Sequence, residues 1–587
     1  MKSSYIAAAV LFFFSLTPAF AQWSGSVSAD GASNFRQSNN ENADFKLKYS
    51  GNKYYVGTGL NFSHSFLPSS QLTSILDAKK EKNEYYKGES KTIDPRKLNA
   101  GAGLNFGYTF NPSNVLDAAM SYGFSGTDEK SLLDSERYNY NGQTGLEGTQ
   151  RDTSYVKNHK FNFNASYIHR ISSRPGARLG VTVSNATSLR TDANRRVTSG
   201  SFYSKPKNYA TYSSINDYDS NLSVFYEDGF MFSKSNLKLK TGVDFITNQD
   251  LDAYTAETLV HGQWRDSLQY RQSYFYNSLA TEPYVNLTYT VGKFDFFIRE
   301  RVQIYRHAMI DKLENIQKPG DVQTLFDRYD TRNLLSAGMT YRVNDAHRVT
   351  VDYGRSIARP DYAKLCPTLM IGKSEGEYFL GNPDLLPEIT DKINLNYRYA
   401  KGIFVTTLDI NYRDRQNTAE KVIDLERAVG TLDPMVRTLY TWVNSKRQNS
   451  IGSKLDLKVD GNNIKADIWA GFNYDTYWKN GKADKSDFNY ELGALIDVLL
   501  NETVKLSYSL VYISAKTSAY SRKGEDILAN LRFSKVLNKG LELYAEFKDI
   551  ADKEIYEETW NADMNYLKVS STKPMHRAAV LGVKYAF

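Results

Sequence analysis

Apolar side chains recur at every second position of this chain, over stretches of ten or more residues. In segment 98–110, Leu, Ala, Phe and Tyr occupy the even positions, and Asn, Gly and Thr occupy the odd positions. Segments 160–167, 404–413 and 541–548 repeat the alternation. Because successive side chains of a β-strand point to opposite faces, each segment presents one apolar face and one polar or small face. The pattern predicts long β-strands.

The length of these strands decides between two all-β classes. Strands of soluble sandwiches are usually about five or six residues long, whereas a tilted strand that crosses a bilayer needs about ten. A sandwich would also leave the 43 Tyr and 30 Phe residues unexplained. Since a backbone in hydrocarbon must satisfy its own hydrogen bonds, spanning strands require a barrel. We therefore predict a transmembrane antiparallel β-barrel, with its apolar face toward lipid and its polar face toward the lumen.

Short and long connections alternate along the chain, as they do in outer-membrane barrels, which have short periplasmic turns and long extracellular loops. The long polar segments include 126–155 and 190–215, which are expected to be loops. Counting the hairpins, with one further strand at each end, predicts about 22 strands. The ten short turns lie at 50–53, 111–114, 172–177, 229–235, 291–293, 344–347, 400–402, 460–463, 500–503 and 537–540.

The two ends of the chain predict its destination. Residues 1–21 combine Lys2, an apolar run and a small-x-small site, which is typical of a secretory signal peptide. Residues 22–587 are expected to form the barrel. Its last strand ends on Tyr585 and Phe587, and an aromatic-terminated final strand resembles the signal that the barrel-assembly machinery recognises. We expect a protein of the outer membrane of a Gram-negative bacterium, in contact with outer-membrane lipid.

Several function classes are disfavoured. The net charge of +7 is modest and the charges alternate in sign, without the basic patch that nucleic-acid binding needs. Cys366 is the single cysteine, so a disulfide scaffold is excluded. The seven His residues are scattered, with no pair at a metal-ligand spacing. No cofactor, metal site or catalytic residue is predicted, and enzyme activity at the rim is the least favoured hypothesis.

Motifs in the second half of the chain resemble the barrel of TonB-dependent receptors, and most closely the outer membrane protein beta-barrel family. In that family a strand ending in Arg-Pro leads into a loop, and Gly-Asn-Pro-x-Leu-x-Pro-Glu opens the next strand. Segments 353–367 and 377–399 match this pattern, and the residues around Asn444 and Gly452 resemble a later strand start. The Pro and Gly residues either fix a turn or serve gating or ligand binding. The matching residues are Arg359, Pro360, Gly381, Asn382, Pro383, Pro387 and Glu388.

The chain also departs from the pattern of TonB-dependent receptors. Those receptors carry a globular plug of roughly 150 residues before a barrel whose lumen is normally filled. Here strand-like alternation begins directly after Gln22, and no energy-coupling segment is visible. We therefore expect a barrel without a plug, and energised import is not transferred to this chain.

Two functional hypotheses remain besides the disfavoured enzyme. The first is a transport channel for a solute, with a polar lumen of mixed charge. The second is a receptor or assembly shell, whose plug or surface lipoprotein partner is a separate chain. The side chains expected to face the lumen are Asn394, Asn396, Arg398, Asp409, Asn411, Arg413, Lys505, Ser507, Glu542, Glu546 and Lys548.

Overall fold

The computed structural model describes most of the chain after residue 22. No helix among these residues is long and apolar enough to cross a membrane. The expected signal peptide (1–21) and Phe587 lie outside the described residues. The described ranges are 23–33, 39–66, 69–77, 84–92, 96–138, 144–174, 176–199, 208–260, 263–266, 272–312, 323–367, 369–371, 377–423, 438–444, 447–479, 482–517, 521–538, 540–551, 553, 555–561, 566–573 and 578–586.

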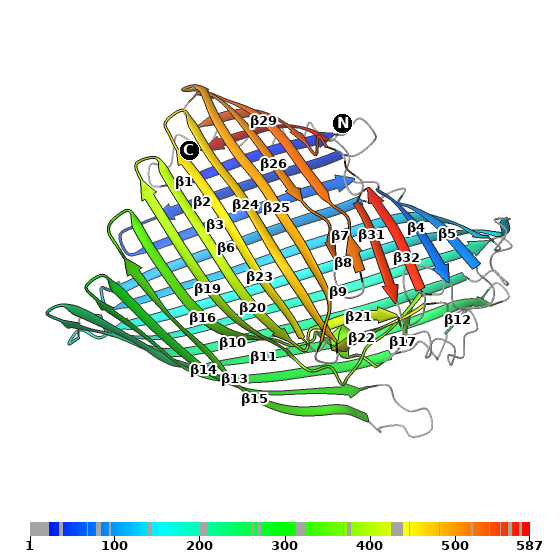
Figure 1. The fold of residues 1–587 in the computed structure, drawn as a ribbon, viewed down its shortest axis with the longest axis horizontal. Helices are drawn as coiled ribbons and strands as arrows, with labels where there is room; N and C mark the ends of the chain where they lie inside the picture. The colour runs from blue at the N-terminus through cyan, green and yellow to red at the C-terminus, as the bar shows by residue number, and fades with distance from the viewer. Residues whose placement is uncertain are drawn as a thin grey trace.

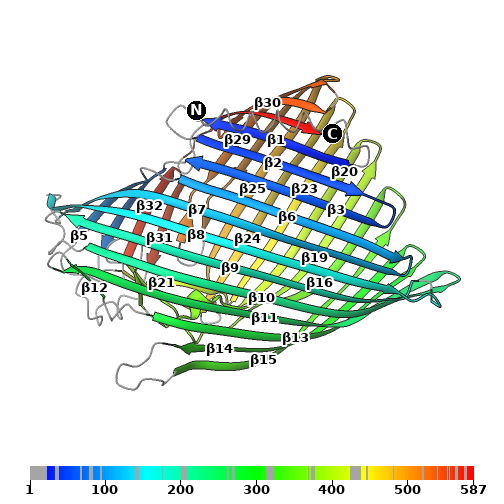
Figure 2. The same ribbon diagram turned by 180° about the vertical axis from the view of Figure 1, so that it is seen from behind.

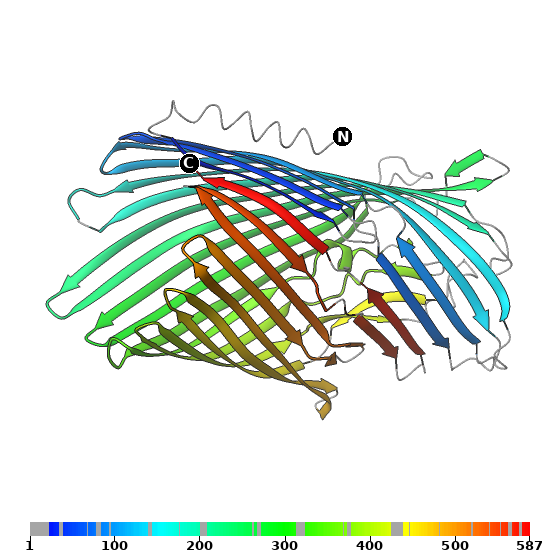
Figure 3. The same cartoon turned by 90° about the horizontal axis from the view of Figure 1, so that it is seen from above.

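Antiparallel strands form one continuous wall in the described part of the chain (Figure 1). Each wall strand pairs with two neighbours, and β33 pairs with β1, so the wall meets itself; Figure 3 shows red β33 beside dark-blue β1. These 22 strands confirm the predicted architecture. They are β1 Trp23–Ser33, β2 Asn39–Ser50, β3 Tyr54–Phe66, β6 Arg96–Asn111, β7 Asn114–Tyr138, β8 Thr144–Arg170, β9 Arg178–Ser199, β10 Asn208–Phe232, β11 Ser235–Val260, β13 Gln272–Val291, β14 Phe294–Asp311, β15 Gln323–Arg342, β16 His347–Ala358, β19 Glu388–Lys401, β20 Phe404–Gln416, β23 Arg447–Asp460, β24 Ile464–Lys479, β25 Lys482–Asn501, β26 Val504–Ile513, β29 Asp526–Asn538, β30 Leu541–Lys548 and β33 Ala578–Ala586.

Alternation along the strands separates the two faces of the wall as predicted. On β13, Tyr274, Tyr276 and Tyr284 at even positions are buried, while Leu279 and Val285 at odd positions are 45% and 42% exposed. The buried series points into the barrel and the exposed apolar series points outward, because neighbouring side chains of a strand take opposite faces. The outer surface is accordingly apolar over most of the wall.

The wall is uneven in height, as Figure 2 shows for the long strands β7 to β11. Strand β8 has 27 residues and β11 has 26, whereas β30 has 8 and β33 has 9. The expectation of loops at 126–155 and 190–215 was wrong for most of these residues, which extend β7, β8, β9 and β10. Polar strands pair in water as well, because pairing satisfies their backbone groups.

A second set of strands, here called the outer tier, continues the sheet past the ends of the short wall strands on either side of the β1–β33 junction. Here β4 pairs with β32, so a hairpin near the N-terminus joins one near the C-terminus. The tier continues through β5 to the outer end of β7, and through β31 to β28. Its strands are β4 Ser69–Asp77, β5 Glu84–Thr92, β27 Lys516–Thr517, β28 Ser521–Lys523, β31 Ile555–Asn561 and β32 Tyr566–Lys573, while β12 Gln263–Asp266 extends the hairpin end of β11.

Candidate functional site: the inner cap

Two connections of the barrel, from β16 to β19 and from β20 to β23, fold together into a small sheet. Its order is β17-β18-β22-β21, with β18 and β22 parallel. We call the described residues of 359–387 and 417–444 the inner cap; Figure 3 shows its yellow strand β22 within the outline of the wall. The elements of the cap are α2 Tyr362–Leu365, β17 Leu369–Ile371, β18 Glu377–Leu380, β21 Ala419–Ile423 and β22 Thr438–Asn444.

The cap is anchored to the inner face of the wall by an apolar core. Leu365, Cys366 and Leu385 of the cap are at most 2% exposed. They pack against inward-facing side chains of β13, β14 and β15. Burial at this depth stabilises the cap by about 1.5–3 kcal/mol for each large apolar side chain. The wall residues of this core are Tyr274, Tyr276, Met309 and Phe326.

Arg359, the motif residue at the end of β16, ties the cap to the wall. Its guanidinium lies 3.6 Å from the centre of the Tyr305 ring, donates to the Gln303 side-chain oxygen at 2.5 Å, and pairs with Asp330 at 3.2 Å. Only 16% of the Arg359 side chain is exposed. A planar cation stacked on an aromatic ring while donating sideways is an arrangement that Arg forms and Lys does not.

A chain of polar contacts continues from Arg359 along the inner wall. Gln303 donates to Glu282, which is 3% exposed. Arg301 donates to the same carboxylate at 2.6 Å and pairs with Asp244 at 3.2 Å. Each buried charge therefore has an opposite charge or a donor beside it, as burial requires. The cap is linked electrostatically to the middle of the wall.

The Gly-Asn-Pro motif closes the cap against α2. A Cβ built on Gly381 would lie 2.2 Å from the carbonyl oxygen of Cys366, so only glycine fits there. Asn382 donates from its backbone N–H to Lys364 O at 2.7 Å, and from its side chain to Trp442 O at 2.9 Å. Asn382 thus holds both connections of the cap together.

Asn444 is the second residue that joins the two connections. Its Oδ1 accepts the Leu386 N–H at 2.8 Å, and its Nδ2 donates to Leu386 O at 3.0 Å and to Asn417 O at 2.7 Å. Asn417 has φ 60, a left-handed backbone that Asn tolerates better than most residues. The Asn444 amide therefore satisfies backbone groups that have no place in a strand ladder.

The other motif residues lie at the ends of these contacts. Pro360, Pro383 and Pro387 are half-buried in the connection, and Glu388 opens β19, accepting the Thr390 hydroxyl at 3.2 Å. In this arrangement the motif residues position backbone and bind one another. A role in fixing turns is the one these contacts favour.

The residues expected to face the lumen form short polar groups, some between neighbouring strands and some along one strand. Asn394 donates to Asp352 at 2.7 Å, and Asn396 donates to Asp409. Arg413 donates to Asn411 at 3.2 Å. Glu542 pairs with Arg532 at 3.2 Å, Glu546 with Lys548 at 4.0 Å and Lys505 with Asp497 at 2.8 Å, while Arg398 lies opposite Arg348 and Thr407, and Ser507 opposite Asp497 and Arg532.

Sequence reasoning missed the wall half of the site. Tyr276, Glu282, Arg301 and Gln303 carry the cap, although none belongs to a motif. The available signal was the alternation in 272–284, where polar and aromatic residues share one strand face. Among the described residues, no group of three or more His, Cys, Asp or Glu side chains could hold a metal ion.

A family model covers most of the wall and the whole cap. The description "Outer membrane protein beta-barrel family" matches residues 187–585. The chain belongs to this family. Membership places it in the outer membrane of Gram-negative bacteria, and no curated protein matched the sequence significantly.

Solved structures share the family's fold at low sequence identity. The ferripyoverdine receptor of Pseudomonas aeruginosa matches with a TM-score of 0.64 and 11% identity, over 96% of this chain and 72% of that one. The copper transporter OprC matches with 0.65 and 13%, over 96% and 80%. The ferric-catecholate import receptor Fiu from K12 E. coli matches with 0.63 and 11%, over 96% and 82%. These likenesses show that the chain shares the barrel fold of these receptors and of this transporter.

Strands β10 and β11 have 25 and 26 residues, more than a bilayer crossing needs, and their outer ends carry an acidic group. Asp250 lies fifteen residues beyond Ser235, past the roughly ten that a tilted strand needs to cross. It faces Asp217 across β10 and β11, with Asp219 and Asp252 nearby. Burial, and then the charges of Asp217 and Asp219, raise the pKa of Asp250 to about 7.

The outer ends of β10 and β11 are therefore expected to open more readily as the pH rises. A carboxyl pKa near 7 in the folded state and about 3.9 in the unfolded state contributes stability that is full below pH 4 and is lost as the pH rises through 7. Hydrogen exchange of amides 215–219 between pH 5 and pH 8, corrected for intrinsic rates, measures this. Asp250→Asn should flatten the profile; an unchanged slope in that variant would contradict the assignment.

Proposed function

We propose that this barrel is a channel for the uptake of a solute across the outer membrane, with its inner cap narrowing the lumen and no plug in the same chain. The observation that carries the proposal is the cap itself. A barrel of this size leaves a wide lumen unless something fills it. Here two of its own connections fold inward onto the wall around Arg359 and Leu385. Strand β1 begins at Trp23 and enters the wall directly.

The remaining inner wall suits passage of a polar solute. The polar groups that contain Asn394, Asp409, Arg413, Glu542 and Lys548 mix both signs of charge with amides. Such a surface is wetted without strong preference for either ion sign. The outer-membrane lipid contacts the outward apolar face, and Tyr585 with Phe587 is proposed to guide insertion by the barrel-assembly machinery. A non-enzymatic role is part of the proposal.

One observation favours the second candidate, a shell that holds a separate plug or lipoprotein. The inner face of β3, β6 and β7 carries small residues, including Gly59, Gly103 and Gly123, where an added Cβ would make only ordinary van der Waals contacts at 3.7–4.0 Å. A hollow of about 570 Å³ lies over this face, between Asp44 and Lys160. A small-residue wall lets another backbone approach closely.

Single-channel conductance of the purified mature barrel in planar bilayers separates the two candidates. Large, stable steps are the expected result and would mean that the lumen is wet around the cap. Heat-denatured protein provides the control for leakage. Silence from a folded barrel would overturn the channel and leave the shell, and recovery of a co-purifying periplasmic or lipidated chain would identify its occupant.

A further inference from the structure

The outer face of β14 carries a carboxylate in the middle of its lipid-facing band. Its outward positions run from Phe294 to Ile304, which is about the length that a tilted strand needs to cross the bilayer. Phe294, Ile298 and Ile304 on this face are 37%, 46% and 49% exposed. Glu300 stands at the same alternating positions, near the middle of the band. Arg306, which is paired with Asp327 at 2.7 Å, follows beyond its outer end.

The neighbouring strand adds a second polar group to this surface. In the pairing of β14 with β15, Glu300 lies opposite Leu335 and Val302 lies opposite Asn333. Residues opposite one another share a face, so Asn333 also points to lipid, and it is exposed. Neither Glu300 nor Asn333 has a hydrogen-bond or ion-pair partner within the described chain.

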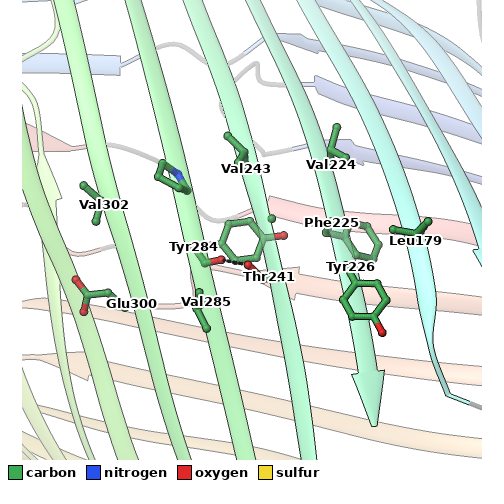
Figure 4. Close-up of a pocket in the computed structure, with 12 residues that line it drawn as sticks. Leu179, Val224, Phe225, Tyr226, Thr241, Val243, Tyr284, Val285, Glu300 and Val302 are labelled. Carbon is green, nitrogen blue, oxygen red and sulfur yellow. Dashed lines mark hydrogen bonds between the residues drawn. The ribbon is translucent and has the colours of Figure 1, made fainter. Parts of the chain in front are cut away.

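The wall beside Glu300 is also indented. A hollow of about 550 Å³ is lined by Glu300, Val302, Val285, Val243 and Pro283. Figure 4 shows how Glu300, Val302, Val285 and Val243 lie around it. Pro283 has no N–H to donate, and the pairing of β13 with β14 has a gap between Thr281 and Tyr284, with the same register on both sides of it. The outer surface here is thus uneven as well as polar.

Acyl chains cannot satisfy these two groups. A carboxylate and an amide facing hydrocarbon both lose their hydrogen bonds to water, which makes polar residues on a lipid face costly and marks them as functional candidates. Their chemistry is complementary: an ionised carboxylate only accepts hydrogen bonds, and the Asn amide nitrogen donates two. A suitable partner would place an amide donor beside Glu300 and a carboxylate beside Asn333.

We propose that this face, built around Glu300 and Asn333, is the interface between two copies of the chain within the membrane. When two copies are related by a two-fold axis along the membrane normal, the same patch of each copy forms the interface, so the patch must be complementary to itself. Glu300 of each copy then accepts from the Asn333 amide of the other, so all four groups are satisfied at once. The second copy supplies both groups in the required order, and the hollow beside Glu300 gives its side chains room to approach.

The double variant E300L/N333L tests the interface. Native mass spectrometry of the folded barrel in mild detergent should give a dimer for the wild type and a monomer for the variant. The variant is expected to fold, because both changes replace polar groups by apolar ones on a lipid face. Ser453→Leu is the matched control: Ser453 lies on the outward face of β23 between Ile451 and Leu455, and its replacement should leave the dimer intact.

Asn333→Asp keeps the size of the side chain and replaces the donor by a second carboxylate, so it should also abolish the dimer. In vesicles, a disulfide cross-link between two copies of an Ile298→Cys variant measures whether the chain is a dimer. The native Cys366 does not interfere, because it is buried in the cap. A wild type that is monomeric in both settings overturns the proposal. A dimer that survives in E300L/N333L or in N333D also overturns it. So does a monomeric wild type that binds a lipid molecule, if the double variant no longer binds that lipid.

Discussion

Replacing Arg359 by alanine is expected to release the inner cap from the wall while leaving the barrel folded. The change removes the stacking on Tyr305 and the bonds to Gln303 and Asp330. It also leaves Asp330 with less positive charge beside it. Loss of a largely buried cation of this kind costs about 2–4 kcal/mol of local stability. Hydrogen exchange of the described cap amides, around 362–366 and 439–444, should therefore accelerate by about thirtyfold to several hundredfold, since every 1.4 kcal/mol is a factor of ten.

Arg359→Lys is the informative control for this prediction. Lysine keeps the charge but loses the planar group that stacks on Tyr305 while reaching Gln303 and Asp330. Exchange in that variant should fall between wild type and Arg359→Ala. If the two variants matched the wild type, the apolar core around Leu385 would hold the cap without help from Arg359.

Replacing Gly381 by alanine is expected to displace the loop from α2. The added Cβ would lie 2.2 Å from Cys366 O and 2.6 Å from Cys366 N, and both are backbone atoms that no side-chain rotation can move away. Overpacking of a tight site costs about 1–3 kcal/mol, and separation of the loop would also expose part of the Leu365 and Leu385 packing. Protection of the Asn382 amide should fall most strongly.

Gly229→Ala supplies the matched control for Gly381→Ala, because a Cβ at Gly229 would meet nothing within 4 Å. That variant should exchange like the wild type throughout the cap. For both variants, the temperature at which the cap unfolds can be compared with the temperature at which the whole barrel unfolds. If Gly381→Ala and Gly229→Ala showed the same exchange and melting, the backbone at Cys366 would have moved to accommodate the added Cβ, and the prediction would be wrong.

Strand positions and faces could be predicted from the sequence because they follow a local rule. The alternation in 98–110 or 404–413 specifies a strand and its lipid face without reference to any other segment. The extensions of β7 and β8 were missed because polar residues there alternate without an apolar signal. Glu300 was visible in principle, as a charged residue at an outward position of segment 294–304.

The cap could be predicted only in part. Arg359, Gly381 and Asn382 belong to a recognisable motif, yet their partners lie in other connections. Asn382 bonds to Trp442 O across sixty positions, and β18 pairs with β22 in parallel. No periodicity encodes contacts between two loops, because they depend on how the finished wall brings the loops together.

The junction of β1 with β33 has a consequence for how the molecule is made. It pairs Ser26 with Ala586, and the outer tier joins Ser70 with Lys573, so its contacts have the greatest sequence separation that the chain allows. Contacts of this kind form slowly, and until they form both terminal strands expose an unpaired edge. Until nine-residue β33 has paired, the partly folded wall is therefore an open sheet that is prone to aggregation and must be kept apart from its neighbours.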